Sequence, residues 1–319
     1  MTSIFPELSF SSMSATDWLG ALLIAALAFI LGFALNRGSI CTVIATADWV
    51  LRKRPARSIA LLESALWAGV VYAVLGVAPF MPAGWLPIEY LLAGAILFAL
   101  GSYVNGACVF GSIGHIGNGD IQVSLVFVGI FLVTFVEPIA KLLPEHPPLS
   151  LPLLGGAMLF VGLIIVVVGI RFFLARRDRA NFRVLTVSMG LIGVSFATLA
   201  SVAPLFSITA SIEAVVSVPV AGAVAVMGMS LGSITSSLLR NGAFRFKLPT
   251  WGGMLRHLTG GILMGLGAVL IPGGNDTLLL TGFPGAAWQA LLAYVVIVGV
   301  LAALIAGFGS KAMAWGDRG

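Results

Sequence analysis

Long apolar runs, separated by short polar or glycine-rich stretches, make up most of this sequence. About 20 consecutive apolar residues form a helix that crosses the hydrocarbon core of a bilayer. The pattern predicts nine such crossings, together with short interrupted segments. The nine apolar runs lie at approximately 17–36, 58–80, 90–104, 121–143, 151–175, 184–203, 213–235, 251–271 and 285–308. The predicted fold class is therefore an all-α integral membrane protein.

Two of the remaining stretches, 38–50 and 106–119, are too short to cross a bilayer, and they contain the only two cysteines, Cys41 and Cys108. Non-helical backbone at membrane depth is tolerated only where it is buried in protein or lines a cavity. We therefore expect two re-entrant half-helices with their thiols on a polar pathway. The glycines of Gly111–Asp120 are too dense for a stable helix, which predicts backbone amides there that are open to an anion.

Composition supports the membrane assignment, because 59% of the 319 residues are hydrophobic and only 9% are charged, against roughly 25% charged residues in soluble domains. The length fits a single polytopic domain, 1–319. Its first half, about 1–170, and its second half, about 184–319, are joined by a basic loop at 171–183.

Basic residues predict the orientation of the chain in the membrane. The stretches Arg52–Arg57, Arg171–Arg183 and Arg240–Lys247 belong in the cytoplasm by the positive-inside rule. An odd number of crossings then puts the N-terminus outside and the C-terminus in the cytoplasm. The basic loops are expected to meet anionic lipid of the bilayer and no nucleic acid.

An internal repeat is indicated by Leu92–Cys108 and Leu258–Gly274, which align at a constant offset of 166 (258 minus 92) with six of 17 positions identical. Both copies are glycine-spaced helices that run into a break, which is the pattern of a transporter site near the midplane. Chance similarity between leucine- and glycine-rich segments competes with this interpretation. A weaker match joins Arg37–Cys41 to Asn241–Arg245. The predicted topology makes the first pair inverted and the second pair run in the same sense, so the two matches disagree.

The two cysteines have several interpretations. Each is a small buried hydrophobe in the simplest one, and a disulfide or a metal site is weaker, because the thiols face a reducing compartment and no CxxC or histidine ligand spacing is present. The remaining interpretation makes them weak S–H donors to a sulfur-bearing solute. No metal and no cofactor are predicted, and the absence of GxxxxGK[ST] and HExxH argues for a transporter and against an ATPase or a metal-dependent hydrolase.

Other candidates for solute binding surround the breaks. Arg37 and Arg245 would attract an anion, although a span-end arginine also snorkels to the interface. Asn105 and Asn275 would donate amide hydrogens or cap half-helices. Glu63 and Glu137 are the carboxylates most clearly inside apolar runs, and both are candidates for ion coupling or a proton relay. Glu137 also lies four residues from Lys141, which fits a structural ion pair. The site set that we predict consists of Cys41, Cys108, Arg37, Asn105, Gly106, Gly111, Gly274, Asn275 and Arg245.

The cysteine loops, Asn36–Cys41 and Gly101–Gly114, resemble those of the YeeE/YedE sulfur-transport family, and the resemblance extends to Gly261–Ala268. It implies import of thiosulfate across the bacterial inner membrane, with Cys41 and Cys108 among the thiols that contact the solute. It also implies a partner, a small cytoplasmic sulfur-carrier protein. A third family cysteine corresponds to Gly274, where a glycine would remove one donor and widen the constriction.

The sequence thus favours a multi-pass inner-membrane transporter of a small sulfur-containing anion, with thiosulfate as the leading solute. Another sulfur or selenium compound is an alternative solute. A different class of function is an intramembrane thiol sulfurtransferase, in which one cysteine carries a persulfide. A structural or regulatory subunit with inert thiols is the third hypothesis.

Overall fold

A computed structural model of the protein describes residues 15–81, 83–134, 147–174, 179–203, 207, 209, 219–242 and 246–309, and most of these residues are helical. The α-helices are α1 (Ala15–Arg37), α2 (Thr42–Arg52), α3 (Ala56–Leu75), α4 (Ile88–Asn105), α5 (Val109–Gly117), α6 (Leu125–Thr134), α8 (Ala157–Leu174), α9 (Arg179–Val202), α11 (Pro219–Asn241), α12 (Trp251–Leu270), α13 (Asn275–Thr277) and α14 (Trp288–Phe308). A 3₁₀ turn, η1 (Ile121–Ser124), a π-helical turn, η2 (Leu278–Gly282), and one antiparallel pair of two-residue strands, β1 (Phe80–Met81) and β2 (Leu149–Ser150), complete the described elements.

The predicted all-α membrane fold is confirmed. Within the described ranges, eight segments are helical, long and apolar enough to cross a membrane. The apolar run predicted at 121–143 differs from the other eight, because its described part is only η1 and the ten-residue α6. Residues 135–146, which include Glu137, lie outside the described residues. Large apolar side chains on α8, such as Met158 and Ile165, face outward, as expected for contact with lipid tails.

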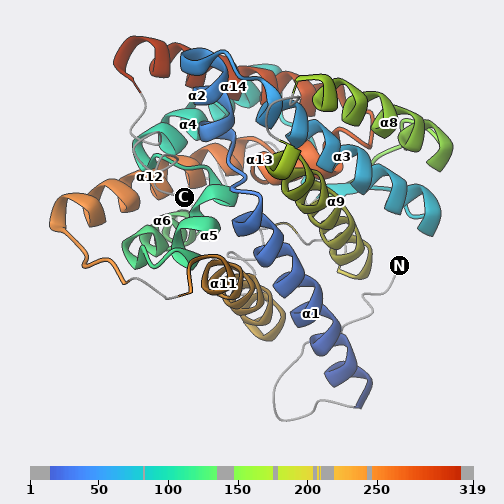
Figure 1. The fold of residues 1–319 in the computed structure, drawn as a ribbon, viewed down its shortest axis with the longest axis horizontal. Coiled ribbons are helices and arrows are strands. Elements are labelled where there is room, and N and C mark those ends of the chain that lie inside the picture. The colour runs from blue at the N-terminus through green and yellow to red at the C-terminus, as the bar shows by residue number, and fades with distance from the viewer. Residues whose placement is uncertain are drawn as a thin grey trace.

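The helices form two groups around a central set of short elements. On one side α3 packs against α8 and α9, and on the other α12 packs against α4 and α6 (Figure 1). Between them lie α2, α5 and α13, each of which begins directly after a break in the chain. The short helices that the sequence predicts after the two cysteine breaks are therefore present, and the breaks are internal to the bundle.

The two segments of the internal repeat form α4 and α12, which pack against each other. Gly94 and Gly101 of α4 are equivalent to Gly260 and Gly267 of α12 at the offset of 166. A Cβ on Gly101 would lie 2.6 Å from the carbonyl oxygen of Gly260, and one on Gly94 would lie 3.0 Å from that of Gly267. Gly101 thus meets the equivalent of Gly94, and Gly94 meets the equivalent of Gly101. The two copies therefore pack antiparallel through the same surface of each, as in an isologous contact.

The weaker repeat also corresponds to a helix contact. Helices α1 and α11 cross closely, with Gly32 against the backbone of Met229 and Gly232 against the backbone of Phe29. Small residues at the crossing allow the two backbones to approach, which is how membrane helices gain packing energy where hydrophobic driving force is absent. Part of the loop that follows α11, residues 243–245, lies outside the described residues, so the loop match itself stays a prediction.

The expectation that Gly111–Asp120 is too glycine-rich for a helix is wrong, because α5 continues through Gly111 and Gly114 to Gly117. Packing requires two of these glycines, since a Cβ on Gly117 would collide with Ser233 of α11 and one on Gly111 with Cys41. Ser233 also donates its hydroxyl to the carbonyl oxygen of Ile113, 2.8 Å away. Tertiary contacts therefore offset the unfavourable helix propensity of glycine, which is about 1 kcal/mol per residue.

A buried ion pair joins α3 to α8. Glu63 and Arg171 form a salt bridge with side chains that are 0% and 1% exposed, and the Arg171 guanidinium also lies over the ring of Phe182, 5.3 Å from its centroid. Glu63 therefore has a charged partner, and its role in the fold is to compensate an arginine that α8 carries into the bundle. Removing either charge alone leaves the other uncompensated in a low-dielectric interior.

The ion pair predicts a difference between single and double substitutions. Glu63→Leu should destabilise the protein by about 3–5 kcal/mol, because Arg171 stays charged without its partner. The double variant Glu63→Leu/Arg171→Met should recover most of that loss. Both changes are measured by heating the detergent-solubilised protein and recording the temperature at which its monodisperse elution peak is lost. Equal unfolding temperatures for the single and double variants would contradict the role assigned to the pair.

Candidate functional site

Both cysteines occupy the same position in their local structure, the residue directly before a short helix. Cys41 is extended, with φ −159°, and precedes α2. Cys108 precedes α5 and follows Gly106, which ends α4 in the left-handed region with φ 84°. A β-carbon is disfavoured at such a φ, so Gly106 allows the chain to leave α4 and place Cys108 at the start of a new helix.

The two cysteine loops bind each other reciprocally. The backbone N–H of Cys108 donates to Sγ of Cys41 at 3.4 Å, and the backbone N–H of Thr42 donates to Sγ of Cys108 at 3.3 Å. Both thiols are buried, with Cys41 2% and Cys108 0% exposed. Two free thiols from two separate breaks in the chain thus form one interior pair.

Gly111 makes the space for this pair. A Cβ at position 111 would lie 2.6 Å from Sγ of Cys41, so a larger residue would displace the thiol. The predicted site residues Cys41, Cys108 and Gly111 are therefore brought together by direct contact. Gly106 contributes through the backbone only, because no heavy atom outside its neighbours lies within 4 Å of a Cβ built there.

Asn105 holds the Cys108 loop by hydrogen bonds. Its amide nitrogen donates to the carbonyl oxygen of Ala107 at 2.6 Å and to Oγ of Ser112 at 3.0 Å. Its amide oxygen lies 2.6 Å from Nδ1 of His257, a residue of α12 that is 1% exposed. Asn105 is thus a structural hub of the loop, and its contact with His257 connects the two repeat copies at the level of the break.

The third break, at Gly274 in the second half of the chain, also reaches the thiol pair. Asn275, the first residue of α13, donates its amide to Oγ1 of Thr42 at 3.1 Å, and Thr42 lies 3.3 Å from the hydroxyl of Tyr294 on α14. Gly274 precedes α13 as Cys108 precedes α5, in agreement with the repeat offset. The three breaks, at Cys41, Cys108 and Gly274, therefore converge on one interior region.

The expectation that Gly274 widens the constriction needs correction. The direction that a Cβ would take from Gly274 is occupied by the hydroxyl of Thr209, and the carboxylate of Asp276 lies 2.6 Å from the same point. Thr209 donates to Oδ1 of Asp276 at 3.2 Å, and both residues are fully buried. Oxygen atoms therefore fill the place of the side chain that glycine lacks.

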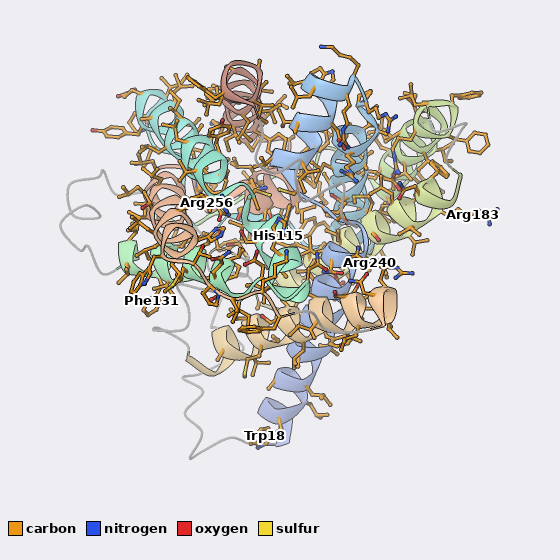
Figure 2. All side chains as sticks on the ribbon, turned by 60° about the vertical axis from the view of Figure 1, so that its left-hand side comes forward. Trp18, His115, Phe131, Arg183, Arg240 and Arg256 are labelled. Atoms are coloured by element: carbon orange, nitrogen blue, oxygen red, sulfur yellow. The ribbon has the colours of Figure 1, made fainter. Side chains whose placement is uncertain are left out.

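Arg37 lies beside the pair without a described hydrogen bond to it. It ends α1 four residues before Cys41 and is close enough to Arg240 of α11 for their charges to repel. Arg240 and Asn36 both donate to Oδ1 of Asn118 just after α5. Figure 2 shows Arg240, Arg256 and His115 gathered toward the interior, whereas Trp18 lies at the outlying end of α1. Arg245 lies outside the described residues.

Past the end of α5, a buried carboxylate faces this basic region. Burial raises the pKa of Asp120, against the opposing charge of Lys247, whose Nζ lies 3.8 Å from Oδ2. The backbone N–H of Lys247 also donates to the carbonyl oxygen of Gly119. These contacts tie the chain after α11 to the C-terminal end of α5, and they place one positive and one negative group at the edge of the site.

Sequence reasoning missed several residues of the site. Thr42, Ser112, Thr209, Tyr294 and His257 are ordinary members of apolar runs or short polar stretches, and only tertiary contacts bring them to the breaks. Thr42 could have been found from its position next to Cys41. The repeat alignment, which pairs Cys108 with Gly274, indicated the break at Gly274. No pattern in the sequence indicates His257.

Broken apolar helices that meet at an interior thiol pair define a multi-pass membrane protein with the architecture of a transporter. Residues 150–303 match the family model Sulf_transp, described as Sulphur transport. This match confirms, over residues 150–303, the resemblance to the YeeE/YedE sulfur-transport family. A search of the curated proteins finds no match.

The family match covers most of the second half of the chain and ends before α14 does. Both cysteine loops lie outside it, so the match supports a sulfur transporter rather than an enzyme but carries no information on the thiols. Two independent parts of the chain, the cysteine loops and residues 150–303, therefore lead to the same family.

Packing around the thiols predicts that two glycines of one helix respond differently to alanine. Gly111→Ala should cost about 1–3 kcal/mol of stability, because the new methyl group displaces Cys41. Gly114→Ala is the matched control, since its nearest outside atom is Cα of Asn36 at 3.9 Å. That variant should be neutral or slightly stabilised, by up to about 1 kcal/mol. Thermal unfolding in detergent compares the two, and equal effects would refute the close approach of Gly111 to the thiol.

Thr209 predicts the outcome of restoring a side chain at the third break. Gly274→Cys alone should unfold at a lower temperature than the parent protein, because Thr209 and Asp276 occupy the space. The double variant Thr209→Ala/Gly274→Cys removes the blocking hydroxyl and should recover at least half of the roughly 1–3 kcal/mol lost. A single variant as stable as the parent would show that the space beside Gly274 is open.

Proposed function

We propose that the protein takes up a small sulfur-containing anion of the thiosulfate type across the bacterial inner membrane, and that the solute passes between Cys41 and Cys108. The observation that carries this proposal is the reciprocal bonding of the two loops. Each sulfur accepts a backbone N–H from the other loop, which leaves its own hydrogen to be donated elsewhere.

Thiols in this arrangement suit a solute that must be bound and then released. An S–H group is a weak donor, whereas an ammonium or guanidinium in the same interior would hold an anion strongly. Conduction requires binding that is favourable enough for entry and weak enough for exit. The polarizable sulfur of a thiosulfate-like anion matches the polarizable sulfurs of the pair.

The basic groups near the thiols supply the attraction that the thiols lack. Arg37 and Arg240 lie close together at the ends of α1 and α11, and Arg256 begins the chain of contacts that reaches Asn105. Fixed positive charge raises the local concentration of an anion and its rate of entry. In this proposal the arginines collect the solute, and the buried pair selects it.

The orientation and the partner are part of the same proposal. The basic stretches put the N-terminus outside and the C-terminus in the cytoplasm. A small cytoplasmic sulfur-carrier protein would then withdraw the product at the cytoplasmic face, and removal of the product would favour net uptake.

Uptake of labelled thiosulfate tests the proposal directly, in a bacterial host that lacks its own thiosulfate uptake and receives thiosulfate as sole sulfur source. Cys41→Ala and Cys108→Ala should each lower the uptake rate at least about tenfold, the cost of losing a buried donor. Cys108→Ser, which keeps a donor hydrogen, should retain more activity than Cys108→Ala. Thr235→Ala, on the exposed side of α11, is the control. Full uptake by both alanine variants at normal membrane levels would exclude the thiol pathway.

The interior thiol pair also permits the second candidate, an intramembrane sulfurtransferase. A cysteine thiolate that attacks the outer sulfur of thiosulfate breaks its S–S bond, releases sulfite and gains about 32 Da as a persulfide, whereas noncovalent passage leaves the mass unchanged. Intact-mass measurement after exposure to thiosulfate separates the two functions. An adduct that disappears in one cysteine variant would favour the sulfurtransferase.

A further inference from the structure

An unbroken series of hydrogen bonds runs from the surface end of α12 to the sulfur of Cys41. It crosses from one repeat copy to the other and contains four bonds. In order, Arg256 Nη2 donates to Nε2 of His257 at 3.3 Å, His257 Nδ1 to Oδ1 of Asn105 at 2.6 Å, Asn105 Nδ2 to the carbonyl oxygen of Ala107 at 2.6 Å, and the N–H of Cys108 to Sγ of Cys41 at 3.4 Å.

The surrounding contacts fix the direction of every bond. The amide nitrogen of Asn105 has two acceptors, Ala107 and Ser112, and the Ser112 hydroxyl itself donates to the carbonyl oxygen of Cys108. The amide oxygen of Asn105 must then face His257, so the imidazole carries its hydrogen on Nδ1. Its Nε2 keeps a lone pair and accepts from the guanidinium of Arg256, which is always a donor.

The peptide group between Ala107 and Cys108 passes this direction on to the thiol. A trans peptide points its C=O and N–H to opposite sides. Asn105 binds the C=O, which turns the N–H toward Cys41. All four donors therefore point the same way, with a guanidinium charge at the head. Hydrogen bonds in such a head-to-tail series polarise one another, and more strongly in a low-dielectric interior.

We infer that Arg256 and His257 are positioning residues for Cys41. Through Asn105 and the Cys108 peptide they aim an N–H at the Cys41 sulfur and polarise that thiol, which strengthens its S–H as a donor to the anion. The relay acts on one thiol of the pair, because the sulfur of Cys108 receives its N–H from Thr42. This role rests on the proposed function to the extent that the solute contacts Cys41.

The internal repeat shows that the relay belongs to one half only. At the offset of 166, the counterparts of His257 and Asn105 are Leu91 and Ile271, both buried and both apolar. At the end of the pair where Asn105 and His257 have their counterparts, hydrocarbon takes the place of the hydrogen bond between them. A buried histidine and asparagine are therefore not required by the frame of α4 and α12.

Two isosteric replacements of His257 separate the relay from a general packing role. In His257→Asn the amide nitrogen lies where Nδ1 was and can still donate to Asn105, whereas in His257→Gln the amide lies at the Nε2 position and that donor is lost. The readout is the rate at which methyl methanethiosulfonate, a small neutral thiol reagent, modifies Cys41 in a Cys108→Ser background. The same rate for Cys108 in a Cys41→Ser background is the internal control.

His257→Gln should slow modification of Cys41 about fivefold, the factor that corresponds to one hydrogen bond of ordinary net strength. Cys108 should stay within about twofold of its parent rate, and His257→Asn should modify Cys41 at close to the parent rate. Equal effects on both thiols, or equal rates in the two His257 variants, would overturn the relay and leave His257 a packing residue.

A second measurement connects the relay with transport. His257→Gln should raise the apparent KM for thiosulfate about fivefold with a smaller change in maximal rate, and His257→Asn should restore KM. An unchanged KM in His257→Gln overturns the inference even if the thiol rates differ. The modification assay requires no transport, so failure of the parent protein to take up thiosulfate would count against the proposed function alone.

Discussion

Every break in a membrane-embedded helix releases backbone N–H and C=O groups that must find partners inside the protein. The released groups cannot turn to water in the hydrocarbon region, and each unsatisfied one costs several kcal/mol. At the Cys108 break, Asn105 takes the Ala107 carbonyl and the Cys41 sulfur takes the next N–H. At the Cys41 break, the sulfur of Cys108 takes the N–H of Thr42. The thiols thus satisfy the backbone of the site as well as face its interior, which explains why the two loops hold a single arrangement.

The frame around these breaks is built from glycine contacts. Where Gly101 meets Gly260 and Gly94 meets Gly267, the backbones of α4 and α12 approach closely, and the breaks at their ends are held at a fixed separation. Small residues likewise let α1 pack closely against α11 at Gly32 and Gly232. In a bilayer, where lipid tails are as apolar as leucine, such close packing supplies much of the helix association.

The sequence indicated the framework of this fold better than its interior. Apolar runs near 20 residues predicted the long helices, because length and hydropathy alone decide whether a helix can span a bilayer. The run at 121–143 is described only as far as residue 134, so the crossing predicted there stays a prediction. Glycine density misled the prediction for α5, since propensity is a local preference and Ser233 and Cys41 are tertiary partners. His257 and Thr209 gave no signal, because their meaning depends on neighbours more than 60 residues away in the chain.

The two ends of the α4–α12 pair differ in chemistry although one set of glycine contacts holds both. One end contains Asn105 and His257, and the other contains Ile271 and Leu91. The close approach of the two backbones depends on the glycines between these ends and not on the side chains at either end. Helix packing and local chemistry are therefore separable in this pair, and a polar group at one end needs no matching polar group at the other.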